Sequence, residues 1–551
     1  MTLVSSWRGR LSRSPAAPRE TASAAPANSP ASPAPPAPAA APYQLPNWRD
    51  WVGVMAMVTG LFLSIMDVQI VVSSLTQIQG GLSASSEEIA WVQTAYLIAH
   101  VVMVPFSGML SRLLSTRFVF VGAALGFTVA SGLCATATSL GEMILWRAAQ
   151  GFFGGALGPL VFPVVYLKFR GRHLAMAMVM VSVILNLSST LGPTVGGFLT
   201  DTLSWHWLFL VNIVPGIGVA IVVWFTIDID KPDWSLLRNF DVTGLILMAL
   251  FFGCLEYALQ EGPRWDWFAE RSIFYATIVS AVAGVFFFWR MLTFRQPIVD
   301  LTVYLNRNFS LGSFYTFVVG TGLYGATYVI PLFLAQVRGF SAMQIGATVV
   351  VTGVAQMAMS PFSAWLARNV DLRIMLAIGL GLFAVSMYMT ACLTSQAGFY
   401  ELLWPQALRG FALMFCYLPA NLIALGSVPP DRLKNAAGLY NLTRDLGGAL
   451  GLASIVTIMN TRFDFHWGRL IEHINPARPV VQQYLESQAN RLEPLIAGDP
   501  HHAAVKLLAN LVQREALVLT YNDVLMMMGV LYVVGVLMMP LVRKPRSTIG
   551  H

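Results

Sequence analysis

Two side chains of opposite charge, Asp67 and Arg147, lie inside long apolar stretches of this chain. A charge in the middle of a membrane helix is costly and marks a functional site by default. Asp67 lies about eight residues and Arg147 about six residues from the same end of their stretches, so at 1.5 Å per residue they share a depth. We expect an ion pair that forms and breaks during a conformational cycle and so changes the proton affinity of Asp67. The alternative is a permanent pair that only joins two helices.

His100 and Asp445 are further candidates for proton coupling. His100 follows Tyr96 by four residues, which places both on one helix face, and an imidazole at mid-membrane could relay protons. The alternative is a neutral histidine bonded across a helix interface. Asp445 is adjacent to Arg444, and successive residues point ~100° apart on a helix, so each is expected to need another partner. For Asp445 that partner is expected to be Arg409.

Polar and amphipathic side chains within the apolar stretches are candidates for lining a substrate cavity, although each could instead bridge two helices. They are Tyr96, Gln150, Asn186, Tyr324, Tyr328, Tyr417, Asn421, Asn441 and Arg444. Glu256, near one end of its stretch, is interpreted as an interface residue close to the lipid headgroups. The four cysteines are scattered in depth, so we expect no disulfide framework, no metal site and no catalytic residues.

These residues belong to fourteen apolar stretches of roughly 18–26 residues, each long enough to cross a ~30 Å hydrocarbon core as a helix. Short polar loops separate them, which predicts an all-α protein that crosses a membrane many times. The expected spans are 51–73, 89–110, 117–138, 141–166, 174–199, 206–227, 241–259, 272–293, 309–334, 341–366, 372–393, 400–425, 435–460 and 521–542.

Composition and charge agree with this assignment. The chain is 56% hydrophobic and 11% charged, where an ordinary globular chain carries about 25% charge. The net charge of +7 does not indicate nucleic acid, because most Lys and Arg residues fall in the tails and short loops of one side. The positive-inside rule makes that side cytoplasmic, with both termini there. Residues 1–48, rich in Pro and Ala, are expected to be a disordered tail, a transit peptide being the alternative.

The sequence repeats itself at a common offset of 255–259 residues. PFSGMLSRLLSTRFVF from Pro105 aligns with PFSAWLARNVDLRIML from Pro361, and NLSSTLGPTVG from Asn186 aligns with NLTRDLGGALG from Asn441. LWRAAQGF aligns more loosely with LWPQALRGF. The offset equals eight spans, so two spans must separate two six-helix halves, an arrangement with a substrate site between the halves and alternating access by rocking.

The expected organisation is therefore six plus two plus six helices. Its boundaries are a tail 1–48, an N-terminal half 49–227, two inserted helices within 228–300, a C-terminal half 301–542 that includes a long outer loop 461–520, and a cytoplasmic tail 543–551. Within the outer loop, residues 463–474 suit an amphipathic helix.

Five motifs make the chain resemble the fourteen-helix drug:proton antiporters of the major facilitator superfamily, of the EmrB/QacA type. They are MDVQIVV at 66–72, LWRAAQGFFGG at 145–155, LGPTVGG at 191–197 with SWHWLFLVNIVPG behind it, DWF at 266–268, and AAGLYNLTRDLGGALG at 436–451. The loop after the second span departs from the family pattern, because Arg112, Leu113, Ser115 and Thr116 occupy its later positions. That departure puts the usual gating contact of the loop in doubt.

The resemblance implies efflux of small amphipathic organic molecules in exchange for protons, in the cell inner membrane, with no cofactor other than the proton gradient. Gly192, Pro193, Gly196 and Gly197 correspond to the antiporter motif, where small residues let helices approach and Pro193 permits a bend. Small-residue packing alone is the alternative. The resemblance also implies that the outer loop contacts a periplasmic adaptor protein that feeds an outer-membrane channel, an isolated lid being the alternative.

Two other functions stay open. A proton symporter that takes up a metabolite would use the same fold, although the antiporter motif argues against it. A polytopic membrane enzyme or receptor would need a cluster of catalytic or ligand groups at one membrane surface, which the sequence does not suggest. An ATP-driven pump is disfavoured because no G-x-x-x-x-G-K-[ST] phosphate loop occurs.

Overall fold

The computed structural model describes residues 46–543, except residues 86, 295, 476 and 495–498 and the side chains of Asn186, Ser189, Thr190, Asn239 and Ala342. The expected tails 1–48 and 543–551 thus lie almost entirely outside the described residues. All regular elements of the described part are helical, as the apolar spacing predicts. Several helices begin at side-chain caps: Asn47 and Asp50 form a capping box at the start of the first described helix.

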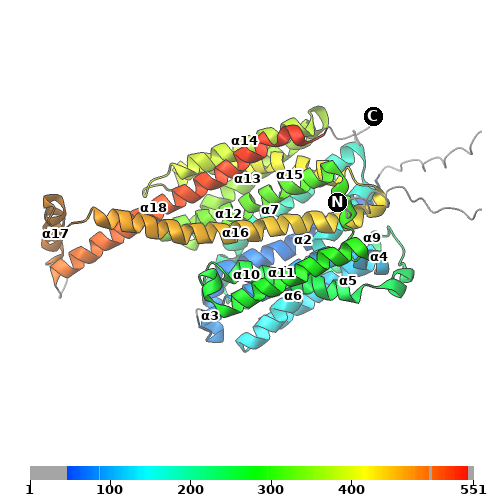
Figure 1. The fold of residues 1–551 in the computed structure, drawn as a ribbon, viewed down its shortest axis with the longest axis horizontal. Coiled ribbons are helices and arrows are strands. Elements are labelled where there is room, and N and C mark those ends of the chain that lie inside the picture. The colour runs from blue at the N-terminus through cyan, green and yellow to red at the C-terminus, as the bar shows by residue number, and fades with distance from the viewer. Residues whose placement is uncertain (1–45, 86, 295, 476, 495–498, 544–551) are drawn as a thin grey trace, which may run out of the picture. The chain divides into compact units, whose positions relative to one another are not determined.

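The helices of the described part follow one another with short connections (Figure 1). Their bounds are α2 Trp48–Ser73, α3 Leu75–Leu82, α4 Trp91–Leu114, α5 Thr116–Ala135, α6 Leu140–Lys168, α7 Gly171–Thr202, α8 Trp207–Leu210, α9 Ile213–Thr226, α10 Val242–Glu261, α11 Arg271–Thr293, α12 Arg307–Gln336, α13 Ala342–Asn369, α14 Leu372–Ala391, α15 Phe399–Leu425, α16 Leu433–Glu472, α17 Pro479–Leu492 and α18 Pro500–Leu537.

Thirteen helices of the described residues are long and apolar enough to cross a membrane, and each corresponds to one expected span. The remaining expected span, 174–199, lies in α7, a helix of 32 residues whose described apolar part is Gly171–Leu185. The membrane-crossing architecture predicted from the sequence is therefore confirmed at the level of its helices.

Two pairs of helices make the most extensive contacts between the halves of the bundle. Helix α7 packs against α13, and α4 packs against α16. In the repeat, α4 corresponds to α13 and α7 to α16, so each contact is the counterpart of the other. A two-fold relation between the halves produces this pairing.

The region 461–520 is expected to be a long outer loop, but most of its described residues are helical. The prediction of a loop is therefore wrong for the secondary structure of this region. Helix α16 has 40 residues and α18 has 38, about 60 Å each at 1.5 Å per residue, which is twice the thickness of a hydrocarbon core. Both helices run past the other helices towards α17 (Figure 1). The amphipathic helix expected at 463–474 is the continuation of α16 to Glu472. Arg462 and His466 of α16 both contact Asp523 of α18, at 2.6 and 2.8 Å, which ties the two extensions together.

Helices α10 and α11 pack on each other, and α10 also packs on α4 and α16. The last residue of α10 and the loop after it are bonded to different helices. Thr94 Oγ1 of α4 donates to Glu261 Oε1 at 2.8 Å. On the other side, Trp267 Nε1 donates to Thr457 Oγ1 of α16 at 2.9 Å, and Asn460 of α16 donates to the carbonyl oxygen of Pro263 at 3.1 Å. This inserted pair therefore contacts both halves.

Candidate functional site

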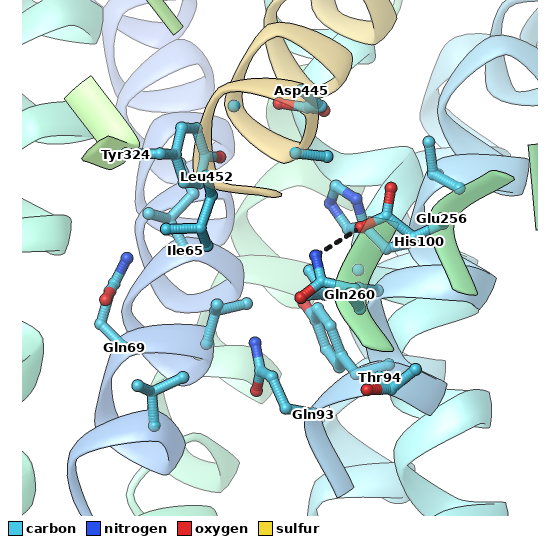
Figure 2. A pocket seen from close by; sticks show the side chains of 18 of the residues that line it. Ile65, Gln69, Gln93, Thr94, His100, Glu256, Gln260, Tyr324, Asp445 and Leu452 are labelled. Atoms are coloured by element: carbon cyan, nitrogen blue, oxygen red, sulfur yellow. Dashed lines mark hydrogen bonds between the residues drawn. The ribbon is translucent and has the colours of Figure 1, made fainter. Parts of the chain in front are cut away.

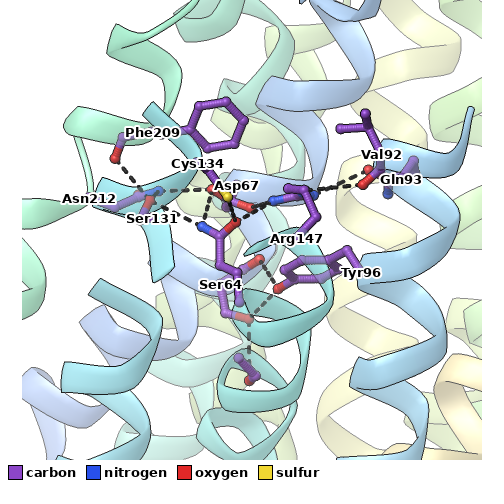
Figure 3. A network of polar contacts seen from close by, with 12 residues as sticks. Ser64, Asp67, Val92, Gln93, Tyr96, Ser131, Cys134, Arg147, Phe209 and Asn212 are labelled. Carbon is purple, nitrogen blue, oxygen red and sulfur yellow. Dashed lines mark hydrogen bonds and ion pairs between the residues drawn. The ribbon is translucent and has the colours of Figure 1, made fainter. Parts of the chain in front are cut away.

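An ion pair joins α2 to α6 in the interior of the N-terminal half (Figure 3). Arg147 Nη1 lies 2.5 Å from Asp67 Oδ2, and neither side chain has any exposed surface. Two amides donate to the other carboxylate oxygen, Gln150 at 2.9 Å and Asn212 at 2.8 Å. Ser131 accepts a hydrogen bond from each of these amides at 3.1 Å. A buried carboxylate is tolerable only when its lone pairs are satisfied in this way.

The guanidinium of Arg147 is fixed by α4 as well. Its Nε donates to the carbonyl oxygen of Val92 at 3.1 Å. Its Cζ lies over the ring of Tyr96, 4.3 Å from the ring centroid. This geometry depends on Gly151, one turn along α6, because a Cβ at that position would overlap the carbonyl oxygen of Tyr96. Glycine thus permits the close approach of α4 and α6 that the ion pair requires.

A cavity of about 350 Å³ lies between the two halves (Figure 2). Helices α2, α4 and α6 form one wall, α12 and α16 form the opposite wall, and α10 closes one side. Its surface is largely apolar and carries a set of polar side chains, as is usual for a site that binds organic molecules. The polar lining consists of Ser64, Gln69, Gln93, Thr94, Tyr96, His100, Glu256, Gln260, Glu261, Arg264, Tyr324, Thr327, Tyr328, Asn441, Arg444 and Asp445.

Tyr96 separates this cavity from the ion pair and contacts both. It lines the cavity, carries the Arg147 guanidinium on its ring, and its hydroxyl lies 3.1 Å from Ser64 Oγ. Ser64, one turn before Asp67 on α2, also lines the cavity. A molecule in the cavity would therefore touch side chains that touch the ion pair.

His100 lines the cavity one turn beyond Tyr96, and the two rings stack with centroids 5.8 Å apart. The shared helix face predicted for these residues is confirmed. Glu256 lines the same cavity from α10, and its carboxylate accepts a hydrogen bond from Gln260 at 2.9 Å (Figure 2).

The interpretation of Glu256 as a headgroup-level interface residue is wrong. Its side chain is only 4% exposed and faces the cavity from α10. The sequence offered a usable signal, namely the spacing of Glu256 and Gln260 by one helical turn on a face that is otherwise apolar.

The prediction that Asp445 pairs with Arg409 is also wrong. Arg444 Nη2 contacts Asp445 Oδ1 at 2.9 Å, although the two are adjacent on α16. The Cβ atoms do diverge, but an arginine side chain is long enough to fold back over the helix surface to its neighbour. Arg444 also donates to the hydroxyl of Tyr417 at 2.9 Å, whereas Arg409 bonds to Thr352 instead.

The residues that were predicted to line the cavity fall into three groups. Tyr96, Tyr324, Tyr328, Asn441 and Arg444 line the cavity. Gln150, Tyr417 and Asn421 do not line it: Gln150 belongs to the ion-pair network, Tyr417 bonds to Arg444, and Asn421 accepts a hydrogen bond from Tyr166 at 3.0 Å. The side chain of Asn186 lies outside the described residues.

The glycines of α7 pack on α2 beyond Asp67. A Cβ on Gly192 would overlap the Cβ of Gln69, and one on Gly196 would lie 2.5 Å from Ser73 Oγ. Gln69 is itself a cavity residue. Pro193 lies inside the continuous helix α7, and Gly197 offers its carbonyl oxygen to Thr200 at 3.1 Å. The small residues therefore set the distance between α2 and α7 next to the cavity.

One ionic contact, made through Asp230 after the N-terminal half, links α16 to that half at the end of the bundle where α2 begins. Lys434 of α16 is bonded to Asp230, which also accepts hydrogen bonds from the backbone and hydroxyl of Thr116. The chain after α4 thus makes a contact across the halves through Lys434, although its sequence departs from the family pattern. Nearby, Ser235 donates to Asp233 and holds the pKa of that carboxyl below its usual range. We call the Lys434–Asp230–Thr116 contact the latch.

Tyr166 of α6 adds a second contact across the halves, because its hydroxyl donates to Asn421 of α15 at 3.0 Å. The cavity reaches the opposite end, where Leu75, Ala90 and Arg264 form part of its wall. The cavity is therefore closed at the end of the bundle that holds the latch and open at the other end, where α2 finishes.

Two similar helical halves around a central cavity, with a buried ion pair beside it, form the architecture of a secondary transporter. The Major Facilitator Superfamily model matches residues 57–452, and the chain belongs to this superfamily. The chain is 37% identical to the "Colistin resistance protein EmrB" of Acinetobacter baumannii over 89% of this chain and 96% of that protein, which places it with the EmrB-type transporters.

The "Multidrug export protein EmrB" of Escherichia coli is 28% identical, over 87% of this chain and 93% of that protein. The solved structure of the proton:xylose symporter XylE covers 89% of this chain with a TM-score of 0.56 at 13% identity, a likeness that concerns the fold alone. These similarities make the chain a transporter rather than an enzyme.

Proposed function

We propose that this protein exports small amphipathic organic molecules across the cell inner membrane in exchange for protons, by alternating access. Relatives that cover most of the chain are named for multidrug export and for colistin resistance, which supports export as the direction. No cofactor is needed in this proposal, because the proton gradient supplies the free energy.

The observation that carries the proposal is the chain of contacts from the cavity through Tyr96 to the Asp67–Arg147 pair. When the cavity closes on a substrate or opens to the other side, Tyr96 and Ser64 move with its wall, and the packing around the pair changes. A carboxylate that gains or loses its cationic partner changes its proton affinity. Asp67 would then bind a proton in one access state and release it in the other.

His100 and Asp445 are the other proposed members of the proton path. The cavity connects both to Tyr96, and His100 stacks on that ring. In this proposal the imidazole relays protons between the cavity water and the N-terminal half, and Arg444 positions Asp445 as a contact for substrate or proton. Tyr324, Tyr328 and Asn441 supply the remaining polar contacts to the substrate.

The orientation that we propose places both termini in the cytoplasm, on the strength of the Lys and Arg distribution. The latch then lies on the cytoplasmic side, and the cavity opens outward. We keep the proposed division into halves 49–227 and 301–542 with the pair α10–α11 inserted between them. A single cysteine at Gly468 should react with an impermeant maleimide applied to intact cells, and one at Lys231 should not.

The extensions of α16 and α18 with α17 are the proposed docking site for a periplasmic adaptor protein, which would hand substrates to an outer-membrane channel. Their length beyond a hydrocarbon core supports this role, because the extra turns must lie outside it. The alternative is a lid that acts without a partner. Deletion of residues 473–499 should abolish export from cells but keep transport in reconstituted vesicles if an adaptor is required.

Transport by the purified protein tests the proposed function directly. Vesicles that contain the protein and a trapped pH dye are given one compound from a panel that includes colistin. An antiporter that binds the compound moves protons in the direction opposite to the compound, so the vesicle interior changes pH with the sign expected for exchange. The sign expected for cotransport would instead identify a symporter, and no substrate-dependent pH change for any compound would contradict proton coupling.

A further inference from the structure

The C-terminal half has two buried guanidinium groups, and of these Arg409, unlike Arg444, forms no ion pair with a carboxylate of the described residues. Arg409 is on α15 and is 4% exposed. Its Nη2 donates to Thr352 Oγ1 of α13 at 3.0 Å, whereas Nη1 is buried and has no hydrogen-bond partner in the part of the chain that the structure describes. A cation at this depth is strongly unfavourable unless a counter-charge compensates it.

The N-terminal half compensates its own buried arginine with a carboxylate. Alignment of LWRAAQGF with LWPQALRGF at their shared Gly-Phe pair sets Gln150 opposite Arg409 and Arg147 opposite Gln406. The arginine and the glutamine have thus exchanged positions between the halves. Each half keeps one guanidinium and one amide at this level of its helix.

The carboxylate of Asp67 has no acidic counterpart at the repeat-related position of the C-terminal half. The repeat offset carries Asp67 of α2 to residues 322–326 of α12, whose sequence is GLYGA. At Gly322 the space is filled by the ring of Tyr532 from α18, which a Cβ would overlap. The C-terminal half therefore has a buried cation but no acidic residue at the corresponding position.

A small cavity of about 10 Å³ lies against Arg409, at the place where the counter-charge is missing. This is the space of about one water-sized ligand. Gln356 of α13, 1% exposed, also lines it, and the Nε2 of its amide is buried without a partner among the described residues. The other walls are Gly322, Leu323, Ala326, Thr327, Val349, Thr352, Phe383 and Leu413.

Arg409 and Gln356 both line this cavity, and each has one buried donor atom without a partner among the described residues. Thr352 accepts from Arg409 and directs its own proton to Gln406 Oε1 at 3.1 Å, so its hydroxyl is already used. The hydroxyl of Tyr532, behind Gly322, likewise has no partner in the described part of the chain. Spare donors around a fixed positive charge match an anion, since a neutral water would leave that charge uncompensated.

We propose that Arg409 and Gln356 form a buried site for one small inorganic anion of the size of chloride, with Thr352 holding the guanidinium of Arg409 in place. The anion neutralises Arg409 as Asp67 neutralises Arg147, and it joins α13 to α15. Sulfate and phosphate are too large for the cavity. The site is separate from the proposed proton path, so it can be tested whether or not export is proton-coupled.

Thermal unfolding of the purified full-length protein in detergent tests the site. Chloride or bromide, compared with gluconate at equal ionic strength, should raise Tm by about 2–4 °C and saturate, and sulfate should not. A cryo-EM or crystal structure in bromide should show bromide beside Nη1 of Arg409. Equal Tm values in chloride and gluconate, or a water in place of bromide, would overturn the proposal.

Substitutions of Gln356 separate an anion site from simple packing. Gln356→Glu supplies a built-in carboxylate, so Tm should no longer depend on chloride. Gln356→Leu removes one donor and should raise the chloride concentration at half-effect roughly tenfold, the loss of one hydrogen bond to a charge. Arg338→Gln, outside the cavity, is the control and should keep the response of the original chain. An unchanged chloride response in Gln356→Glu would contradict the assignment.

Discussion

Asp67 combines two properties that a proton carrier needs, complete burial and a partner on another helix. Asp67→Asn keeps the shape of the side chain and its amide and arginine neighbours but cannot titrate. We expect substrate-induced proton movement in vesicles to disappear, while substrate binding, measured by fluorescence quenching, is retained within about tenfold because the side chain lies outside the cavity wall. Proton exchange with unchanged pH dependence would move the coupling site to Asp445 or His100.

The control for this change is Asp50→Asn on the same helix. Asp50 forms an ion pair with Lys168 at 2.8 Å, but both side chains are partly exposed. Pairs of this kind contribute about 0–1 kcal/mol, so transport and proton movement should persist. Arg147→Ala, by contrast, leaves a buried carboxylate without its partner and should lower the free energy of unfolding by about 3–5 kcal/mol. The loss would appear as a lower Tm of the purified variant.

Glu256 provides a prediction on substrate choice. Its carboxyl group lines the cavity, so Glu256→Gln removes an acidic group from the wall while nearly keeping the volume of the side chain. We expect export of cationic compounds to fall about tenfold or more, the effect of one charged contact, with uncharged compounds less affected. Growth on gradient plates with matched cationic and neutral compounds measures the ratio, and equal losses for both would contradict a role in recognition.

At this scale the sequence predicted the Asp67–Arg147 pair because depth along a helix follows from residue count alone. It did not predict that Arg444 folds back onto Asp445, or that Arg409 lacks a carboxylate, because these depend on side-chain conformation and on which helix packs opposite. Residue spacing gives the helix face, and only tertiary packing gives the partner.

The contact of α7 with α2 requires a residue without a side chain at position 192. Gly192 lies against Gln69, where a Cβ would already overlap, so Gly192→Leu must separate the two helices beside the cavity. We expect export to be abolished while the protein still reaches the membrane, and a Tm lowered by several degrees.

Gly122→Leu on α5 is the matched control, because a Cβ on Gly122 meets no atom within 4 Å. Its export and Tm should be close to those of the original chain. If Gly192→Leu transported as well as Gly122→Leu, the glycines of α7 would be ordinary packing residues.

The helical elements could be predicted almost completely from the sequence, because an apolar run of sufficient length has one solution in a membrane. The charge of the region 461–520 excludes a further span there, but it does not show that the two flanking spans continue into this region as the helices α16 and α18. Helix α16 continues from the cavity at Arg444 into that region without interruption.

For the molecule as a whole, the latch fixes which side of the cavity is closed. Lys434→Gln removes the ionic contact with Asp230 across the halves, so the population should shift away from the outward-open state. In a variant without native cysteines, a cysteine at Leu452 in the cavity wall should then react several-fold more slowly with an external thiol reagent. Lys168→Gln breaks a contact within one half and should leave that rate unchanged, and equal rates in both variants would remove the latch from the mechanism.

The inserted pair α10–α11 is bonded to α4 through Glu261 and to α16 through Trp267. If the halves rock apart and together, both bonds cannot persist through the cycle, so the loop between these helices must release one half and regain it in each turnover. In the orientation proposed above, the loop faces away from the cytoplasm and is a target for inhibition from that side of the membrane. An antibody fragment that clamps it to both halves would arrest export without competing with any drug for the cavity.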